Sequence, residues 1–184
     1  MFKRNKKEYD KLADHIGQFP VVMISPYDAD LISEGSEVRR KWIDGIISQF
    51  DRAYLDDLQK YNKVLEQRNA LLKQQYENGF FDRESMEIWD IQLIRYGNAI
   101  YAKRVEFIEA FIPLFQRYYQ WISGGEEQVS MEYQSALHSG SFEHLLQQAQ
   151  PKDSRVQYTT VGIHKDDVPV SYTHLRAHET RMVI

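Results

Sequence analysis

Apolar residues recur at steps of three and four through the middle of the chain, which is the period of an α-helix. A first periodic stretch follows Gly35 and Ser36, a turn and a helix N-cap, and runs to about Phe50. The second ends at Asn78-Gly79, a turn signal. Its seam has asparagine at two heptad core positions and comprises Leu55, Leu58, Asn62, Leu65, Asn69 and Leu72.

A longer periodic run then predicts a helix over residues 84–121, with Pro113 near its end as the site of a kink. Because a short turn separates it from the preceding heptad helix, the two should fold back as an antiparallel hairpin. Gly124-Gly125 fits the stop of the second helix. The middle of the chain is therefore predicted to be a long helical hairpin.

Strand-like patterns flank this hairpin. The apolar run "VVMIS" at 21–25 suits a buried strand, and alternation over 129–133 predicts another. A short helix capped by Ser141 is predicted at 141–149, and the β-branched stretch at 155–163 predicts a third strand. The fold class is mainly α with a minor β part, a helical arm that leaves a β-containing body and returns to it.

The amino-acid composition excludes only a few classes of function. The 184 residues carry a net charge of −4, so attraction to nucleic acid would need a local basic patch. Cysteine is absent, which excludes disulfides, thiolate metal sites and cysteine nucleophiles. There is no run of eighteen apolar residues that would predict a membrane span.

The one basic triplet, Arg39-Arg40-Lys41, lies in the first turn of a predicted helix and is the candidate DNA-binding site. Phosphate contacts from three cations would give modest, salt-dependent binding. The alternative is a solvated face or pairing with nearby acids. Those acids are Glu34, Glu37 and Asp44.

Two other clusters suggest chemistry at first sight. Asp166 and Asp167 follow His164, but neighbouring strand residues point to opposite faces, so a structural or subunit-interface role is favoured over catalysis. His174 and His178 could ligate a metal, yet two ligands do not make a tetrahedral zinc site. We assign no catalytic, metal or cofactor-binding residue.

Three stretches of the chain carry a recognisable pattern, namely "PVVMISPYDADLISEGSEVRRKWIDGIISQ" (20–49), "YNKVLEQRNALLK" (61–73) and "VGIHKDDV" (161–168). Together they resemble the RecF family, bacterial DNA replication and repair proteins with an ABC/SMC-like ATPase head. The middle stretch is the most specific. The resemblance marks a set of residues as structural family motif, namely Tyr61, Gln67, Arg68, Asn69, Gly162, His164, Asp166 and Asp167.

This resemblance implies a function for the full-length family. Its members bind double-stranded or gapped DNA as ATP-dependent homodimers, with Mg²⁺ and a weak ATPase activity. They support recombinase loading with RecO and RecR, and the SOS response, in the bacterial cytoplasm at the nucleoid. The alternative function is a non-catalytic helical-hairpin module for protein–protein interaction.

The chain departs from the family pattern in what it lacks. The family's phosphate-binding loop contains a Gly-Lys pair, and none occurs here; its signature and Mg²⁺-binding aspartate would follow residue 168. We therefore expect an internal fragment that binds no ATP or Mg²⁺ and does not hydrolyse ATP. Residues 1–35 would be part of the head, 36–127 the arm, 128–169 the return into the head, and 170–184 a non-native tail outside the fold.

Overall fold

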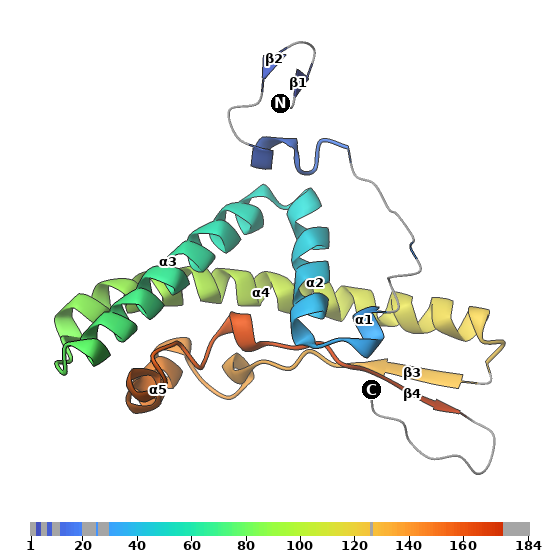
Figure 1. The fold of residues 1–184 in the computed structure, drawn as a ribbon. Helices are drawn as coiled ribbons and strands as arrows, with labels where there is room; N and C mark the ends of the chain where they lie inside the picture. The colour runs from blue at the N-terminus through green and yellow to red at the C-terminus, as the bar shows by residue number, and fades with distance from the viewer. Residues whose placement is uncertain are drawn as a thin grey trace.

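The computed structural model describes residues 3–4, 7–8, 12–19, 25, 30–125 and 127–174. Most of this part is helical, with two small antiparallel sheets (Figure 1). In chain order the elements are β1 (Lys3–Arg4), β2 (Lys7–Glu8), η1 (Leu12–His15), α1 (Asp30–Ser33), α2 (Ser36–Phe50), α3 (Arg52–Glu77), α4 (Arg83–Ile122), β3 (Glu127–Met131), η3 (Ala136–His138), α5 (Phe142–Val156), η4 (Ile163–Lys165) and β4 (Val170–His174).

The predicted hairpin is present as α3 and α4, which run antiparallel, and α5 packs against both of them (Figure 1). Asp51 caps α3 by accepting a hydrogen bond from the Tyr54 amide at 2.9 Å, and Asp82 caps α4 in the same way. The turn between the helices contains Gly79 at φ +66°, a conformation that favours glycine. The periodic signal and the turn signal were therefore both informative.

The predicted heptad seam on α3 is confirmed only in part. Its leucines are buried or pack against the core, whereas Asn62 is exposed and Tyr61 is buried in its place. Asn69 is half-buried beside Arg68, which is buried because acidic side chains from other helices pair with it.

The chain after α4 differs from the prediction in two places. Residues 170–174, which the sequence analysis left outside the fold, form β4 and pair antiparallel with β3, with Val129 opposite Tyr172. The strand predicted at 155–163 is wrong, since α5 continues to Val156 and a loop follows from Gln157. The strand near 129–133 and the helix capped by Ser141 are confirmed.

Some predictions fall outside the described residues, among them most of the strand at 21–25 and residues 175–184 with His178. Pro113 lies inside α4, which continues to Ile122. Gly124 and Gly125, both with positive φ, follow the helix end as expected. Within the described residues, no helix combines the length and apolarity that crossing a membrane requires.

Candidate functional site: a polar junction

Buried polar side chains connect the hairpin to the chain that returns after α5. The structure brings the motif at 61–73 against the motif at 161–168, roughly a hundred positions later in the sequence. We call this cluster the junction. It comprises Asp44, Tyr61, Arg68, Asn69, Arg104, Asp153, Thr159, His164 and Asp166.

Arg68 on α3 is the first of two buried arginines, with its side chain only 1% exposed. Its Nε donates to Asp90 of α4 at 2.6 Å. Its Nη1 donates to Asp153 of α5 at 2.9 Å and to the Thr159 hydroxyl at 2.8 Å. Removing a partner from a buried guanidinium is costly, so these bonds tie α3, α4, α5 and the following loop together.

Arg104 on α4 is the second buried arginine, 2% exposed. Its Nη2 reaches both oxygens of Asp44 on α2, at 2.9 and 3.1 Å. Its Nη1 donates to the Ile163 carbonyl at 2.7 Å and to Asp166 at 3.2 Å. Tyr54 completes the set, since its hydroxyl lies 3.1 Å from the Arg104 Nε and also bonds Asp44.

The Asp166 carboxyl is buried and shared. It accepts from the Tyr133 hydroxyl at 2.5 Å as well as from Arg104. Burial raises the pKa of Asp166 above its ordinary value, although both hydrogen bonds act in the opposite direction. Arg104 itself stays charged, because the neighbouring acidic groups outweigh its burial and raise its pKa.

Tyr61 and His164 form the contact between the two motifs. The Tyr61 hydroxyl lies 2.8 Å from His164 Nδ1, and His164 Nε2 lies 3.1 Å from the Thr159 carbonyl. A carbonyl can only accept, so Nε2 carries the proton and Nδ1 accepts from the tyrosine. Burial lowers the pKa of His164 to about 4, which keeps the ring neutral at physiological pH.

Gly162 is required by the same contact. It has φ +127°, and a Cβ there would lie 2.7 Å from the Tyr61 hydroxyl oxygen and 2.8 Å from the Phe142 ring. Only glycine permits both the backbone conformation and this close approach. The Gly-x-His spacing of the motif therefore has a physical cause in the packing of Tyr61 and Phe142.

Asn69 and Asp153 bind the backbone of the loop after α5. The Asn69 side-chain oxygen accepts from the Thr159 amide at 2.8 Å and from its hydroxyl at 2.7 Å. Asp153 accepts in the same way from the amide and hydroxyl of Thr160. These bonds hold the segment that the sequence predicted as a strand. Gln67, the remaining predicted motif residue on α3, is exposed.

The three residues of the basic triplet lie in different surroundings in the structure. Arg39 makes a bidentate pair with Asp167, with Nε to Oδ1 at 2.7 Å and Nη2 to Oδ2 at 3.0 Å, and donates to the carbonyls of Leu31 and Glu34. The Asp167 carboxyl is partly buried, but the Arg39 guanidinium outweighs that burial and holds its pKa below the ordinary value. Arg39 thus fixes the start of α2 to the end of the motif at 161–168.

Arg40 is also engaged within the chain. Its Nη1 donates to the Asp166 carbonyl at 2.6 Å and to the Ser36 hydroxyl at 2.7 Å. Lys41 alone is largely exposed, at 75%, and pairs with Glu37 on the same helix. The predicted pairing alternative named the right kind of contact, but it missed Asp166 and Asp167 because they lie far away in the sequence.

The sequence analysis did not single out Asp153 of the junction, or Tyr54 and Tyr133 beside it. It named Asp44 only as a possible partner of the basic triplet. One signal could have identified Arg104 as a core residue. The buried positions Leu93, Gly97, Ile100, Arg104 and Ile108 follow one helical period, so Arg104 rather than Lys103 occupies the core position.

The junction is suited to positioning. Its carboxylates are held by arginines, tyrosines and backbone amides, and the structure shows no group of three or more potential metal ligands among the described residues. Asp166 and Asp167 contact different partners, although they lie in a loop end and not in the strand that the sequence suggested. The junction therefore holds segments that are distant in the sequence in one fixed orientation relative to each other.

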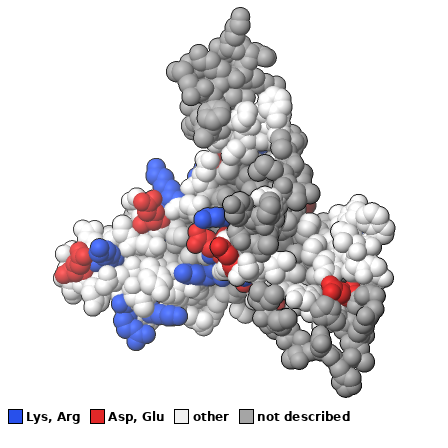
Figure 2. Space-filling view, turned by 45° about the vertical axis from the view of Figure 1, so that its right-hand side comes forward, with Lys and Arg blue, Asp and Glu red and all other residues white. Residues whose placement is uncertain are grey.

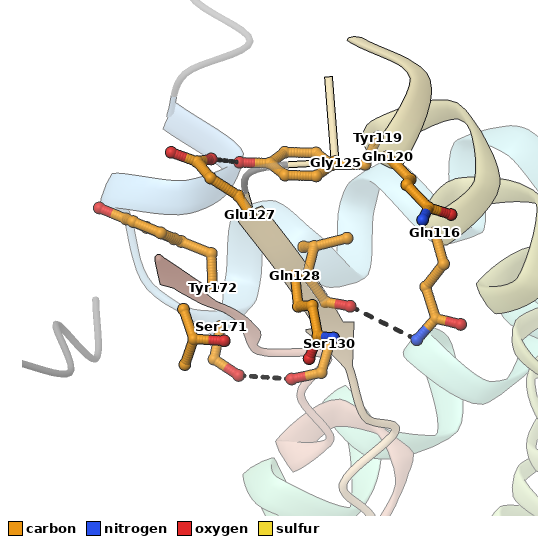
Figure 3. Close-up of a pocket in the computed structure, with 11 residues that line it drawn as sticks. Gln116, Tyr119, Gln120, Gly125, Glu127, Gln128, Ser130, Ser171 and Tyr172 are labelled. Atoms are coloured by element: carbon orange, nitrogen blue, oxygen red, sulfur yellow. Dashed lines mark hydrogen bonds between the residues drawn. The ribbon is translucent and has the colours of Figure 1, made fainter. Parts of the chain in front are cut away.

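A separate polar groove lies between the end of α4 and the β3–β4 ribbon (Figure 3). The Tyr119 hydroxyl donates to Glu127 at 2.5 Å, which raises the pKa of Tyr119 to about 12. Across the ribbon the hydroxyls of Ser130 and Ser171 lie 2.6 Å apart. The Tyr119–Glu127 contact attaches the ribbon to α4, whereas the Ser130–Ser171 contact joins its two strands. The side chains that line the groove are mostly neutral and polar.

Comparison with known proteins gives one consistent relationship. No protein-family model matches the sequence. The chain is 50% identical over 168 residues to the DNA replication and repair protein RecF of Flavobacterium johnsoniae, covering 91% of this chain and 47% of that protein. For the RecF of Phocaeicola vulgatus the identity is 47% over 167 residues, with 91% and 44% covered.

Solved structures agree with these relatives. The recombination mediator protein RecF-ATPrS in the RecFOR pathway matches with a TM-score of 0.83 and 28% identity, over 96% of this chain and 50% of that chain. RecF-ATP in the same pathway gives a TM-score of 0.83 with 30% identity, over 90% and 46%. The chain thus spans about half the length of the relatives it matches.

Proposed function

We propose, on the premise that this chain is a homologue of the RecF family over 91% of its length, that it is the central part of a bacterial DNA replication and repair protein. The sequence identity of 47–50% to proteins of that name carries the proposal. The shared fold, at a TM-score of 0.83, supports it.

We propose that the full-length protein has the same detailed role as the RecF family. The full-length protein would bind DNA in an ATP-dependent manner and work with RecO- and RecR-type partners in recombinase loading and the SOS response, in the bacterial cytoplasm. The names of the two solved neighbours, which include ATP and the RecFOR pathway, support this role. ATP and Mg²⁺ would be bound by parts of the protein that this chain does not span.

We also propose that α3 and α4 form an arm on an ATPase head, with the junction fixing the arm to the returning chain. The support is geometric. Each buried arginine contacts three or four separate segments, so the hairpin cannot tilt without breaking charged hydrogen bonds. Such a fixed joint would make a change in the orientation of the arm move the head with it.

DNA contact within this chain is better assigned to the hairpin than to the triplet. Lys60 of α3 and Arg95 of α4 are exposed and flank the ring of Tyr96, at 5.6 and 5.7 Å from its centroid. Lys63 is exposed one turn further along α3. Basic and acidic side chains are interspersed over this part of the surface, so the attraction would be local and weak (Figure 2).

The first test of the proposal is the sequence of the complete gene. Sequence upstream of the codon for Met1 should encode a strand, a glycine-rich loop with Gly-Lys-Ser/Thr, and a helix. Absence of that loop from the complete gene would remove the repair assignment.

A fluorescence anisotropy titration with duplex DNA tests the contacts. Replacing Lys60, Lys63 and Arg95 together by alanine should weaken binding at low salt. It should also reduce the slope of log K against log salt by roughly one for each phosphate that is no longer neutralised. Lys41→Ala is the matched control, an exposed lysine outside the hairpin, and should leave the slope unchanged. Binding that is absent, or insensitive to salt and to the triple variant, would refute DNA contact by the hairpin.

The alternative, a non-catalytic module for protein–protein interaction, is favoured by one observation. The last turns of α4 expose large apolar side chains, among them Trp121 at 81% and Ile122 at 77%. A non-catalytic module would retain these residues for a separate partner, and its complete gene would encode no phosphate-binding loop.

A further inference from the structure

A groove lies between α4 and α5, close to the turn that joins α3 to α4 (Figure 1). Its base is apolar, because Met86 of α4 and Leu146 of α5 line it and are each only 2% exposed. Ile91 lines the same groove and is 60% exposed. The groove measures about 100 Å³, so it can take side chains from a partner but not a whole segment. We call it the α4–α5 groove.

The apolar surface continues from this groove onto the solvent side of α4. Ile88 precedes Ile91 by three positions, so the two side chains are neighbours on the helix surface, and Ile88 is also 60% exposed. Ile94, three positions after Ile91, lines the groove and is half-buried. Single exposed isoleucines are ordinary, but a row of three beside an apolar groove is typical of a site where another protein packs.

Acidic side chains accompany this apolar surface. Among the residues that line the α4–α5 groove, carboxylates outnumber cations three to one: Glu87, Asp90 and Glu143 against Arg83. Asp90 shares the Arg68 guanidinium with Asp153, so this cluster has one more carboxylate than it has guanidinium groups. The Asp153 side chain is fully buried whereas that of Asp90 is 29% exposed, so the excess negative charge faces the groove. A cation from outside would therefore be attracted there.

We propose that the α4–α5 groove binds one short, cationic amphipathic helix of a protein partner. The apolar side chains of that helix insert between α4 and α5, against Met86, Ile91 and Leu146, and its lysine or arginine side chains lie over the carboxylates. Helices commonly dock in this way, with an apolar face in a hydrophobic groove. The inference goes beyond the proposed function and does not rest on it, because every residue of the groove lies in the described part of this chain.

The charge of the groove distinguishes this occupant from two others. The carboxylates would repel the phosphates of a nucleic acid, which bind to cationic surfaces. A second copy of the chain in a two-fold interface would place the same patch on both sides. Glu87 and Glu143 of one copy would then lie close to the same residues of the other, and like charges would face each other. A cationic helix neutralises them instead.

Fluorescence anisotropy with a labelled synthetic peptide tests the proposal on the 184-residue chain. The probe is a peptide of alanine, leucine and lysine of about 18 residues, long enough to form a helix. Its leucines recur at i, i+3, i+4 and i+7, and its lysines lie on both sides of that face. The control peptide has the same composition with its leucines distributed around the helix. The chain should bind the probe several times more tightly than the control peptide.

Two pairs of variants locate the binding. Ile91→Ser should weaken binding of the probe by about tenfold, because it removes apolar contact in the groove. Ile122→Ser is its matched control, an isoleucine that is 77% exposed at the other end of α4, and should change binding little. Glu87→Lys should weaken binding by reversing a charge at the groove, whereas Glu109→Lys, an exposed glutamate further along α4, should have a smaller effect.

Several results would overturn the proposal. They are absence of binding up to millimolar probe, equal affinity for the two peptides, and equal effects of Ile91→Ser and Ile122→Ser. Loss of binding in Ile91→Ser without any loss in Glu87→Lys would also overturn it, because the groove would then take an uncharged apolar segment. Self-association of the chain that Ile91→Ser abolishes would identify a second copy as the occupant.

A fluorophore in the groove gives a second readout that leaves the apolar residues unchanged, in case Ile91→Ser perturbs folding. The sequence contains no cysteine, so Gln147→Cys allows a single environment-sensitive label at the groove, and Gln120→Cys near the end of α4 is the control. The probe peptide should shift the emission at position 147 only. A shift at both positions, or at neither, would overturn the proposal. The titration with duplex DNA should be the same for Ile91→Ser as for the wild type, so failure of the peptide to bind would leave the proposed function intact.

Discussion

The two ends of α4 contain similar residues in very different surroundings. In its first two thirds the helix contacts α2, α3 and α5 and buries even Arg104. Its last turns expose Trp121, the largest apolar side chain available. The difference shows that burial here depends on how many segments converge on a position, and much less on residue type. Three of the predictions below compare two residues of similar type, one at a convergent position and one outside it, and one follows a buried histidine of the junction as the pH changes.

The largest effect is expected from Arg104→Ala. The change leaves Asp44 and Asp166 without their shared guanidinium, and removing one partner of a buried pair costs about 3–5 kcal/mol of unfolding free energy. The measurement is urea denaturation followed by circular dichroism. Lys103→Ala is the matched control, a neighbouring cation whose side chain is 48% exposed, and it should change stability little. Equal effects of the two changes would mean that the junction does not stabilise the fold.

The contrast along α4 itself is tested with two isoleucines. Ile100 is fully buried, so Ile100→Ala should cost about 2–5 kcal/mol through reduced burial and a cavity. Ile122 is 77% exposed, so Ile122→Ala should stay within about 0.5 kcal/mol in the 184-residue chain. The same denaturation experiment measures both. A large destabilisation at Ile122 would show that the end of α4 is covered in solution.

The junction also predicts a dependence on pH. The folded pKa of His164, about 4, lies below the unfolded value of 6.5, so folding favours the neutral ring. Stability from this group is complete above pH 6.5 and is lost as the pH falls toward 4, by at most about 3 kcal/mol. The measurement is the unfolding free energy of the wild type minus that of His164→Gln across this range.

This difference isolates the histidine, because Asp166 and Asp167 are present in both proteins. Their carboxyl groups shift in opposite directions and would otherwise complicate the profile. A constant difference between pH 7 and pH 4 would contradict the assignment of a buried neutral His164.

The same contrast explains what the sequence could predict. Helix periods, the turn at Asn78-Gly79 and the cap at Ser141 depend on neighbours within a few positions, and the structure confirms them. The resemblance to the RecF family, carried by the motif at 61–73, is confirmed by the relatives.

The junction could not be predicted in the same way, because its partners are distant in the sequence. Arg68 binds Asp153 across 85 positions, and Arg39 binds Asp167 across 128. A pattern of hydrophobicity identifies no distant partner for a charged residue, so it did not place Arg68 or Arg104 in the core. It also assigned Thr159 and Thr160 to a strand, although their side chains and amides bind Asn69 and Asp153.

The smallest effect expected separates two neighbours in the basic triplet. Arg39→Ala should cost roughly 1–2 kcal/mol of unfolding free energy, because it removes a partly buried bidentate pair with Asp167 and two bonds to carbonyls. Lys41→Ala removes only an exposed pair within α2 and should change stability little. Denaturation and the DNA titration should both be run on each variant. An Arg39→Ala protein that is as stable as the wild type but binds duplex DNA more weakly would show that Arg39 contacts DNA. It would also show that the number of segments meeting at Arg39 does not determine the role of this residue.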